Sequence, residues 1–340
     1  MLSPLLSREG AVAGSAADAG VAAHYGDPFR EQRAMAESCS VVDRSHRGVI
    51  RIDGGDRRSW LHSLTTQHLE SLPDRYGAES LVLSPHGHIE HHLVLGDDGD
   101  AMEIDVEPGT AGALVDFLES MRFLLDVKVS DVSEAWALLT LVGPDTTAVL
   151  DKVGLTLPPD PYALAPAPWR GGARRMPWPG AEAADLVVLR EHLADIVAEL
   201  ESAGATLAGV DAFEAFRVAD RRPRLGFETD HRTIPHEVGW LESAVHLDKG
   251  CYRGQETVAR VHNLGRPPRR LLLLHLDGTE SALPLHGDAV QWEGATVGFV
   301  GTAVRHYELG PIALALVKRA TPDAADLVCR GVRASMESQL

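Results

Sequence analysis

The sequence has little cysteine, and what it has is widely spaced. Cys39, Cys251 and Cys329 are the three cysteines among 340 residues. This spacing excludes a disulfide framework and the paired cysteines of a zinc site. We therefore expect reduced thiols, the usual state in a cytoplasm.

Long apolar runs and an excess of positive charge are also absent. No stretch reaches the roughly 18 apolar residues that a membrane span needs, and Arg8 and Glu9 stand where a signal peptide would be apolar. The chain has 32 Lys and Arg against 49 Asp and Glu, a net charge of −17. This charge repels polyphosphates and argues against broad nucleic-acid binding. We expect a cytoplasmic protein that is neither exported nor embedded.

Changes in composition mark the predicted domains. Residues 1–22 are rich in Ala, Gly and Ser, which predicts a flexible leader. Residues 23–266 mix strands and helices and indicate an α+β region of two subdomains, joined by an irregular Pro-rich connector at about 155–181. Residues 267–335 contain short strands between Gly-bearing turns, which favours a small C-terminal β-barrel or sandwich.

Local patterns predict individual elements. Residues 81–83 and 92–95 have strand character and flank a turn at 85–88, which predicts a hairpin. Residues 192–203 have helical spacing, and Gly204 is placed to end that helix. Residues 257–261 alternate in polarity and predict a strand.

The segment Lys249–Glu256, with the sequence K-G-C-Y-R-G-Q-E, carries the candidate chemistry. Gly250 and Gly254 permit a tight backbone path that presents the Cys251 thiol at a loop. Lys249 and Arg253 would favour the reactive thiolate if they lie close to the sulfur in space. The alternative is a cysteine that only fills a turn. The remaining motif positions are Tyr252, Gln255 and Glu256.

This motif resembles K-G-C-Y-x-G-Q-E of the YgfZ-type proteins, relatives of the glycine-cleavage T-protein and of IBA-type mitochondrial proteins. Matching stretches at 51–61, 83–89 and 298–302 extend the similarity over roughly residues 24–320. The resemblance implies an aminomethyltransferase-like fold with mixed and antiparallel sheets, and tetrahydrofolate in a central cavity with Cys251 at its edge. It also implies support of iron–sulfur cluster assembly or repair, with iron–sulfur enzymes or assembly proteins as partners, and an indirect effect on tRNA modification.

Five residues are the candidates for holding the folate. Arginines suit the carboxylates of its glutamate tail, and aromatic side chains can stack on a pterin, although solvent exposure and core packing are the respective alternatives. No metal site is predicted, because Gly87 interrupts the face formed by His86, His88 and their neighbours. The predicted cofactor residues are Arg217, Phe227, Glu228, Trp240 and Arg260.

The sequence departs from the T-protein pattern in two places. The T-protein has approximately G-G-I-x-D-D at the hairpin, whereas residues 87–92 here are G-H-I-E-H-H, and Ala219 replaces a pterin-associated glutamate. Aminomethyl transfer is therefore disfavoured, and a folate-binding accessory protein is the first hypothesis. A one-carbon transferase is the second. Direct RNA binding is the third, through the basic residues of 249–270, which are Lys249, Arg253, Arg260, Arg266, Arg269 and Arg270.

Overall fold

The structure, a computed structural model, describes residues 2–280 and 282–337. The chain forms two compact units. One comprises Met1–Ser63, His68–Ser80 and Leu93–Phe213, and the other Leu64–Gln67, Leu81–His92 and Glu214–Leu340. Within the described residues, every helix is too short or too polar to cross a bilayer.

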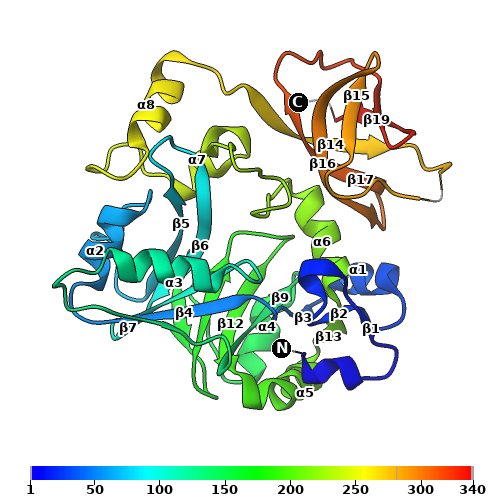
Figure 1. The fold of residues 1–340 in the computed structure, drawn as a ribbon. Coiled ribbons are helices and arrows are strands. Elements are labelled where there is room, and N and C mark those ends of the chain that lie inside the picture. The colour runs from blue at the N-terminus through cyan, green and yellow to red at the C-terminus, as the bar shows by residue number, and fades with distance from the viewer. Residues whose placement is uncertain (1, 281, 338–340) are drawn as a thin grey trace. The chain divides into compact units, whose positions relative to one another are not determined.

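A five-stranded sheet has the order β5-β6-β7-β4-β8 (Figure 1). The pairs β6–β7, β7–β4 and β4–β8 are antiparallel. The predicted hairpin around residues 85–88 is confirmed as β5, its turn and β6. Helices α2 and α3 follow β4 and β7 in the chain, and α3 buries Ala111, Leu114 and Leu118. The bounds are β4 Gly48–Asp53, α2 Arg57–Leu64, β5 Tyr76–Leu83, β6 Ile89–Asp97, β7 Ala101–Val106, α3 Ala111–Ser120 and β8 Lys128–Asp131.

A six-stranded sheet has the order β10-β11-β12-β9-β3-β13, in which only the β13–β3 pair is parallel. Helix α5 ends at Gly204, whose φ of 113° is readily adopted by glycine, so the predicted helix at 192–203 and its end are confirmed. The bounds are α1 Pro28–Glu37, β3 Ser40–Asp43, β9 Trp136–Val142, α4 Thr146–Lys152, β10 Leu164–Pro166, β11 Gly172–Met176, β12 Ala183–Leu189, η3 Arg190–His192, α5 Leu193–Ala203 and β13 Thr206–Ala208.

The N-terminal segment corrects the prediction of a flexible leader at 1–22. It contains η1 (Pro4–Ser7), β1 (Val12–Ala13), η2 (Ala16–Asp18) and the start of β2 (Ala22–His24). Leu5 packs in the core of the six-stranded sheet, and Val21 is fully buried. The Ser3 amide donates to Gly20 O at 2.8 Å. Two apolar side chains and a few hydrogen bonds order the segment, which a search for a continuous apolar face overlooks.

The Pro-rich connector at 155–181 also contains regular structure, contrary to the prediction. Strands β10 and β11 pair antiparallel with each other, and β11 pairs with β12. Pro166 ends β10, which is the edge strand of the sheet. A proline is tolerated there because an edge strand has one side without ladder hydrogen bonds.

The C-terminal strands close into a six-stranded barrel, which confirms the barrel prediction. Its order is β14-β17-β16-β15-β18-β19, and β19 pairs back onto β14. The barrel core contains Leu274, Val290, Val300 and Leu327. The bounds are β14 Arg269–Leu276, β15 Ala289–Trp292, β16 Ala295–His306, β17 Gly310–Lys318, β18 Leu327–Cys329 and β19 Val332–Met336.

Short helices precede the barrel. They are α6 Val210–Ala219, η4 Pro235–Glu237, α7 Trp240–Ala244 and α8 Gln255–Leu264. Helix α8 overturns the strand predicted at 257–261. Val258 and Val261 are three residues apart, which places them on one face of a helix but on opposite faces of a strand. Gly254 begins the helix at its N-cap.

Candidate functional site

Cys251 lies in the short loop between α7 and α8, and its side chain is exposed. The other two cysteines are buried. Burial raises the pKa of the Cys39 thiol to about 11, and that of the Cys329 thiol to about 11 as well. Only the thiolate is a good nucleophile, so among the three thiols the exposed one is placed for chemistry.

Lys249 and Arg253 have contacts other than the one expected with the sulfur. Lys249 is buried, and its Nζ donates to the carbonyls of Thr65 at 2.6 Å and Gln67 at 3.0 Å. Arg253 pairs with Glu90 at 2.9 Å. These contacts hold the loop in place, so they support a structural role for both cations.

Two glycines bring the β5–β6 turn against the start of α8. A Cβ on Gly254 would lie 2.5 Å from Ser84 O, and a Cβ on Gly87 would lie 2.7 Å from Thr257 Cβ. Both glycines have positive φ, of 83° and 79°. The hairpin and the Cys251 motif are therefore one packed unit that tolerates no side chain at these two positions.

The other motif residues build the beginning of α8. The Tyr252 amide donates to Gln255 Oε1 at 2.9 Å, and burial raises the pKa of Tyr252 to about 12. Val258 packs in the neighbouring core, while Glu256 and Arg260 are exposed. A cavity of about 510 Å³ lies along helix α8. It is lined by Leu247, Asp248, Lys249, Tyr252, Gln255, Glu256, Val258, Ala259, His262 and Asn263.

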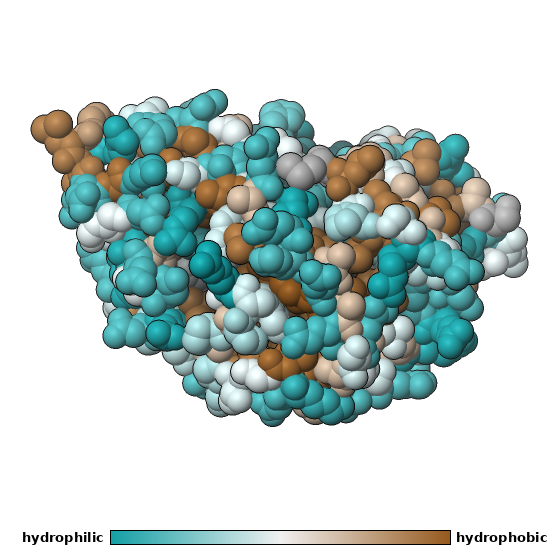
Figure 2. All heavy atoms as spheres, turned by 90° about the horizontal axis from the view of Figure 1, so that it is seen from below, coloured by the Kyte–Doolittle hydropathy of each residue, from teal (hydrophilic) through white to brown (hydrophobic). Residues whose placement is uncertain are grey.

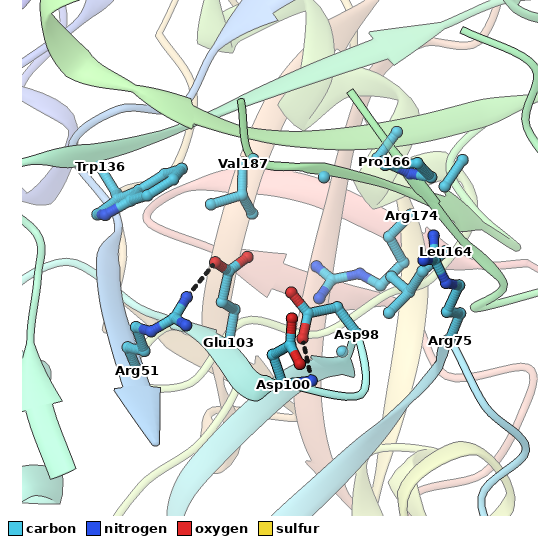
Figure 3. A pocket seen from close by; sticks show the side chains of 15 residues that line it. Arg51, Arg75, Asp98, Asp100, Glu103, Trp136, Leu164, Pro166, Arg174 and Val187 are labelled. Carbon is cyan, nitrogen blue, oxygen red and sulfur yellow. Dashed lines mark hydrogen bonds and ion pairs between the residues drawn. The ribbon is translucent and has the colours of Figure 1, made fainter. Parts of the chain in front are cut away.

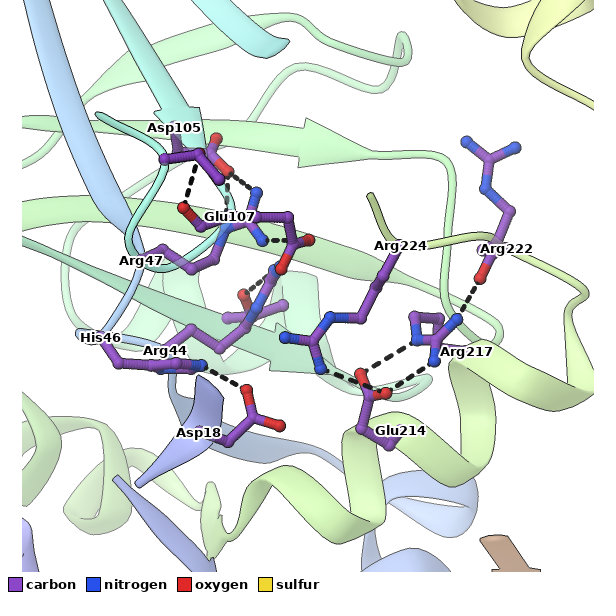
Figure 4. Close-up of polar contacts among 12 residues, drawn as sticks. Asp18, Arg44, His46, Arg47, Asp105, Glu107, Glu214, Arg217, Arg222 and Arg224 are labelled. Carbon is purple, nitrogen blue, oxygen red and sulfur yellow. Dashed lines mark hydrogen bonds and ion pairs between the residues drawn. The ribbon is translucent and has the colours of Figure 1, made fainter. Parts of the chain in front are cut away.

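Arg217 and Glu228 take part in a buried ionic network. The Arg217 guanidinium donates to Glu214 at 2.7 and 3.0 Å (Figure 4). It also donates to Glu228 at 3.2 Å and to Thr302 at 2.7 Å. Arg217 is 1% exposed and Glu228 is fully buried. These internal partners occupy the guanidinium, so Arg217 does not present it to a folate carboxylate.

The two aromatic candidates also have protein partners. Trp240 is 1% exposed and stacks on His92, with ring centroids 4.4 Å apart and planes at 10°. Phe227 is half-buried under the Arg224 guanidinium, which lies 4.2 Å from its ring centroid. Trp240 is therefore a core residue, which was the alternative to stacking on a pterin.

Half of the six basic residues predicted as a patch pair with acids, namely Arg253, Arg269 and Arg270. Arg269 pairs with Asp230 at 2.6 Å and Glu237 at 2.8 Å, and Arg270 pairs with Asp323. Burial alone would raise the pKa of Asp230, but the Arg269 guanidinium holds that pKa well below its ordinary value. Arg260 and Arg266 remain exposed.

The histidines of the hairpin do not gather around one point. His86 is exposed at the turn, whereas His92 stacks on Trp240. Burial lowers the pKa of His91. The described part of the chain contains no group of three or more His, Cys, Asp or Glu side chains placed to hold a metal ion.

Sequence reasoning missed a buried charge network in the first unit (Figure 4). Arg47 pairs with Asp105 and Glu107, at 2.9 and 2.8 Å, as Figure 4 shows. Arg174 pairs with Asp105 and with Asp185, the latter at 2.9 Å. Arg174 and Asp185 are direct partners in the register of β11 and β12. Charged residues within otherwise apolar strands were a signal, but their pairing depends on that register.

The model of the GCVT N-terminal domain family matches residues 2–249. The chain belongs to this family. The match covers more than half of the 340 residues and ends at the first residue of the Cys251 motif. The predicted relationship to the T-protein superfamily is thereby confirmed.

Relatives of the GCVT family resemble most of this chain. A chloroplastic "putative transferase" of Arabidopsis thaliana is 28% identical over 294 residues, covering 84% of this chain and 66% of its own length. An aminomethyltransferase of Synechococcus sp. (strain WH7803) is 26% identical, covering 79% and 76%. An aminomethyltransferase of Rubrobacter xylanophilus is 25% identical, covering 88% and 82%.

The solved aminomethyltransferase T of the Bartonella henselae glycine cleavage system has the same fold. Its TM-score is 0.85 with 19% identity, and the match covers 98% of this chain and 95% of that one. The predicted aminomethyltransferase-like fold with a C-terminal barrel is therefore confirmed. A shared fold does not by itself imply a shared reaction.

Proposed function

We propose that this GCVT-family protein is a tetrahydrofolate-binding accessory protein of the YgfZ type, which supports iron–sulfur cluster assembly or repair through Cys251. The observation that carries the proposal is the exposed thiol on a loop packed against the β5–β6 turn by Gly87 and Gly254. A protein that needed this cysteine only as filler would bury it, as it buries Cys39 and Cys329.

The residues of the second unit fit a folate in part. The cavity along α8 is within the size range of small-molecule sites, and it offers the amide of Gln255 and the ring of His262 as hydrogen-bonding groups. Arg260 is exposed on the same helix, and the described residues provide it with no ion-pair partner. Arg217, Glu228 and Trp240 would shape the site only through the core that they stabilise. When bound, the folate would supply one-carbon chemistry.

The thiol distinguishes this proposal from simple folate storage. Cys251 does not line the cavity itself, but Lys249 and Tyr252 on either side of its position in the chain do. An exposed cysteine there suits a transient contact with a cluster or a partner thiol, because thiolate sulfur is a soft ligand. Glu90 and Arg253 hold the loop to the hairpin at 2.9 Å, so the thiol is presented from a fixed backbone. The preferred partner is an iron–sulfur enzyme or an assembly protein.

Folate binding is tested by thermal unfolding with 5-formyltetrahydrofolate. A ligand that binds only the native state at about 100 times its Kd stabilises it by about 2.7 kcal/mol, so we expect Tm to rise by several degrees. The Arg260→Gln variant should lose part of this rise without losing stability, because Arg260 is exposed. An unchanged Tm at millimolar folate would contradict the proposal that the chain binds folate.

The role of the thiol is tested separately in a strain that lacks its YgfZ-type protein. We expect Cys251→Ser to fold normally and to bind folate, since surface substitutions change stability by about 0.5 kcal/mol or less, yet to leave iron–sulfur enzyme activity low. Cys329→Ala is the matched control and should restore activity, because Cys329 is buried in the barrel. Full restoration of iron–sulfur enzyme activity by Cys251→Ser would show that the thiol has only a structural role.

A folate-dependent one-carbon transferase is the second candidate, favoured by the aminomethyltransferases among the relatives. The hairpin weighs against it, since Glu90 is paired with Arg253 and His92 is stacked on Trp240. Neither side chain is then free to act as the base that an amine substrate needs. Turnover of a methylamine donor with tetrahydrofolate would decide for the transferase.

A further inference from the structure

A second cavity lies in the first unit, between the end of the β6–β7 hairpin and strands of the six-stranded sheet (Figure 3). Its volume is about 300 Å³, at the lower end of the range for small-molecule sites. Neither the sequence motif nor the proposed folate chemistry uses it. The residues that the argument below needs are Arg51, Arg75, Asp98, Asp100, Glu103 and Trp136.

Several charges around the cavity are already neutralised. Arg174 is buried and pairs with Asp105 and Asp185. Arg51 donates to Asp53 at 3.0 Å and more distantly to Glu103, at 3.4 Å. Burial raises the pKa of Glu103, and the opposing effect of Arg51 is smaller. These pairs build the wall and leave Glu103 only weakly compensated.

Three other charged side chains face the cavity without a charged partner. Within residues 2–280 and 282–337, the Arg75 guanidinium and the Asp100 carboxylate form no hydrogen bond or ion pair, and Asp98 accepts only from the amides of Asp100 and Ala101, both at 2.9 Å. Figure 3 shows Asp98 and Asp100 between Arg75 on one side and the Arg51–Glu103 pair on the other. The open cavity therefore offers one cation and two anions to a ligand.

Arg75 is held in this place by its backbone. Its φ of 56° is uncommon for a residue with a side chain and costs free energy. Leu164 N donates to Arg75 O at 2.9 Å, and Gly77 N donates to Tyr162 O at 2.8 Å, on either side of a β-bridge between Tyr76 and Ala163. These bonds fix the Arg75 backbone, from which the side chain reaches the rim of the cavity.

The apolar walls are also preformed. A Cβ on Gly171 would lie 3.0 Å from the Trp136 ring, and a Cβ on Gly96 would lie 2.9 Å from the Leu164 side chain. The two glycines thus let an indole and a leucine approach the backbone closely. A ligand would find a flat aromatic wall without having to rearrange the chain.

We propose that this cavity binds a small free amino acid, with preference for a basic one. Arg75 takes the α-carboxylate in a two-pronged contact, and Asp98, Asp100 and Glu103 take the ammonium groups. Trp136 covers the aliphatic part of the ligand. The unpaired carboxylates outnumber the unpaired guanidinium, so a second ammonium group strengthens binding, whereas inorganic phosphate is repelled.

The test is calorimetric titration of the full chain with L-lysine and two comparison compounds. Cadaverine lacks the α-carboxylate, and L-norleucine lacks the second ammonium group. We expect saturable binding of L-lysine at millimolar concentrations or below, and each comparison compound should bind about tenfold more weakly. No saturable binding of L-lysine, or equal binding of all three compounds, overturns the proposal.

Variants assign the two ends of the ligand. The Arg75→Gln variant should bind L-lysine and cadaverine with equal affinity. The Asp100→Asn variant should show a smaller difference in affinity between L-lysine and L-norleucine than the wild type. Arg30→Gln and Asp116→Asn, exposed on α1 and α3, are matched controls and should bind like the wild type. We expect the Tm of all four variants to equal that of the wild type, because these side chains are exposed. Wild-type preferences in Arg75→Gln or Asp100→Asn would overturn the assignment.

Discussion

At the scale of the residue, the three cysteines show how the environment decides what one side chain can do. Cys39 Sγ forms a weak hydrogen bond with Thr146 Oγ1 at 3.7 Å in the core of the six-stranded sheet. Cys329 lies in the barrel core. Cys251 is exposed between two glycines. Desolvation disfavours the thiolate of the two buried cysteines, so only Cys251 combines access with a thiol.

This difference predicts selective alkylation. Iodoacetamide at mildly alkaline pH should modify a single thiol per native chain, because Cys39 and Cys329 have pKa values of about 11 and are shielded from the reagent. Mass spectrometry of intact protein measures the number of adducts. Cys251→Ser should show none when native, and unfolding in denaturant should expose every remaining thiol. Two adducts on the native chain would contradict the assignment.

At the scale of the element, the contact between the β5–β6 turn and α8 explains the glycines of two separate motifs. Gly87 N donates to Ser84 O at 2.9 Å, and Ser84 N donates to His88 O at 2.8 Å, which closes the turn. Gly254 then approaches Ser84 O so closely that no Cβ fits. The hairpin sequence and the cysteine motif are constrained together because they share one surface.

Replacing Gly254 should therefore be costly. Gly254→Ala combines a positive φ with a clash against backbone, and we expect it to lower the free energy of unfolding by roughly 3 kcal/mol. Gly226→Ala is the control, since Gly226 has the same φ of 83° but nothing within 4 Å of its Cβ position. It should cost about 1 kcal/mol. Urea unfolding measures both, and equal losses would show that the close contact contributes nothing.

At the scale of the whole molecule, acidic residues outnumber basic ones, 49 to 32, and engage many of the arginines. The face shown in Figure 2 is mainly hydrophilic, with apolar side chains in small groups. Within the second unit, Arg217, Arg269 and Arg270 all pair with acids. The basic run of the sequence is consequently weaker as an anion site than its count of cations suggests.

Nucleic-acid binding should accordingly be weak. The net charge of −17 opposes phosphate contact, and Arg269 would have to leave Asp230 and Glu237 to make one. We expect the Kd for tRNA at physiological salt to be weaker than about 10⁻⁴ M, the upper end of non-specific binding. Fluorescence anisotropy measures it. Tighter, salt-dependent binding that is lost on replacing Arg260 and Arg266 would support the RNA hypothesis instead.

Local patterns in the sequence were enough to predict the kinds of element, the barrel, the family and the cysteine that the fold exposes. Those features depend on local periodicity, turn residues and a contiguous motif. Prediction failed where short local patterns are ambiguous, as in the strand predicted at the start of α8, or where a few distant contacts order a segment, as Leu5 does near the N-terminus.

The partners of the charged and aromatic side chains became known only from the folded chain. Arg217 bonds to Thr302 and Lys249 bonds to Thr65. Arg75 lies at the rim of a cavity, next to the β-bridge between Tyr76 and Ala163. The partners in each contact are far apart in the chain. Whether a charge is neutralised inside the fold or offered to a ligand depends on those partners, and no local pattern contains that information.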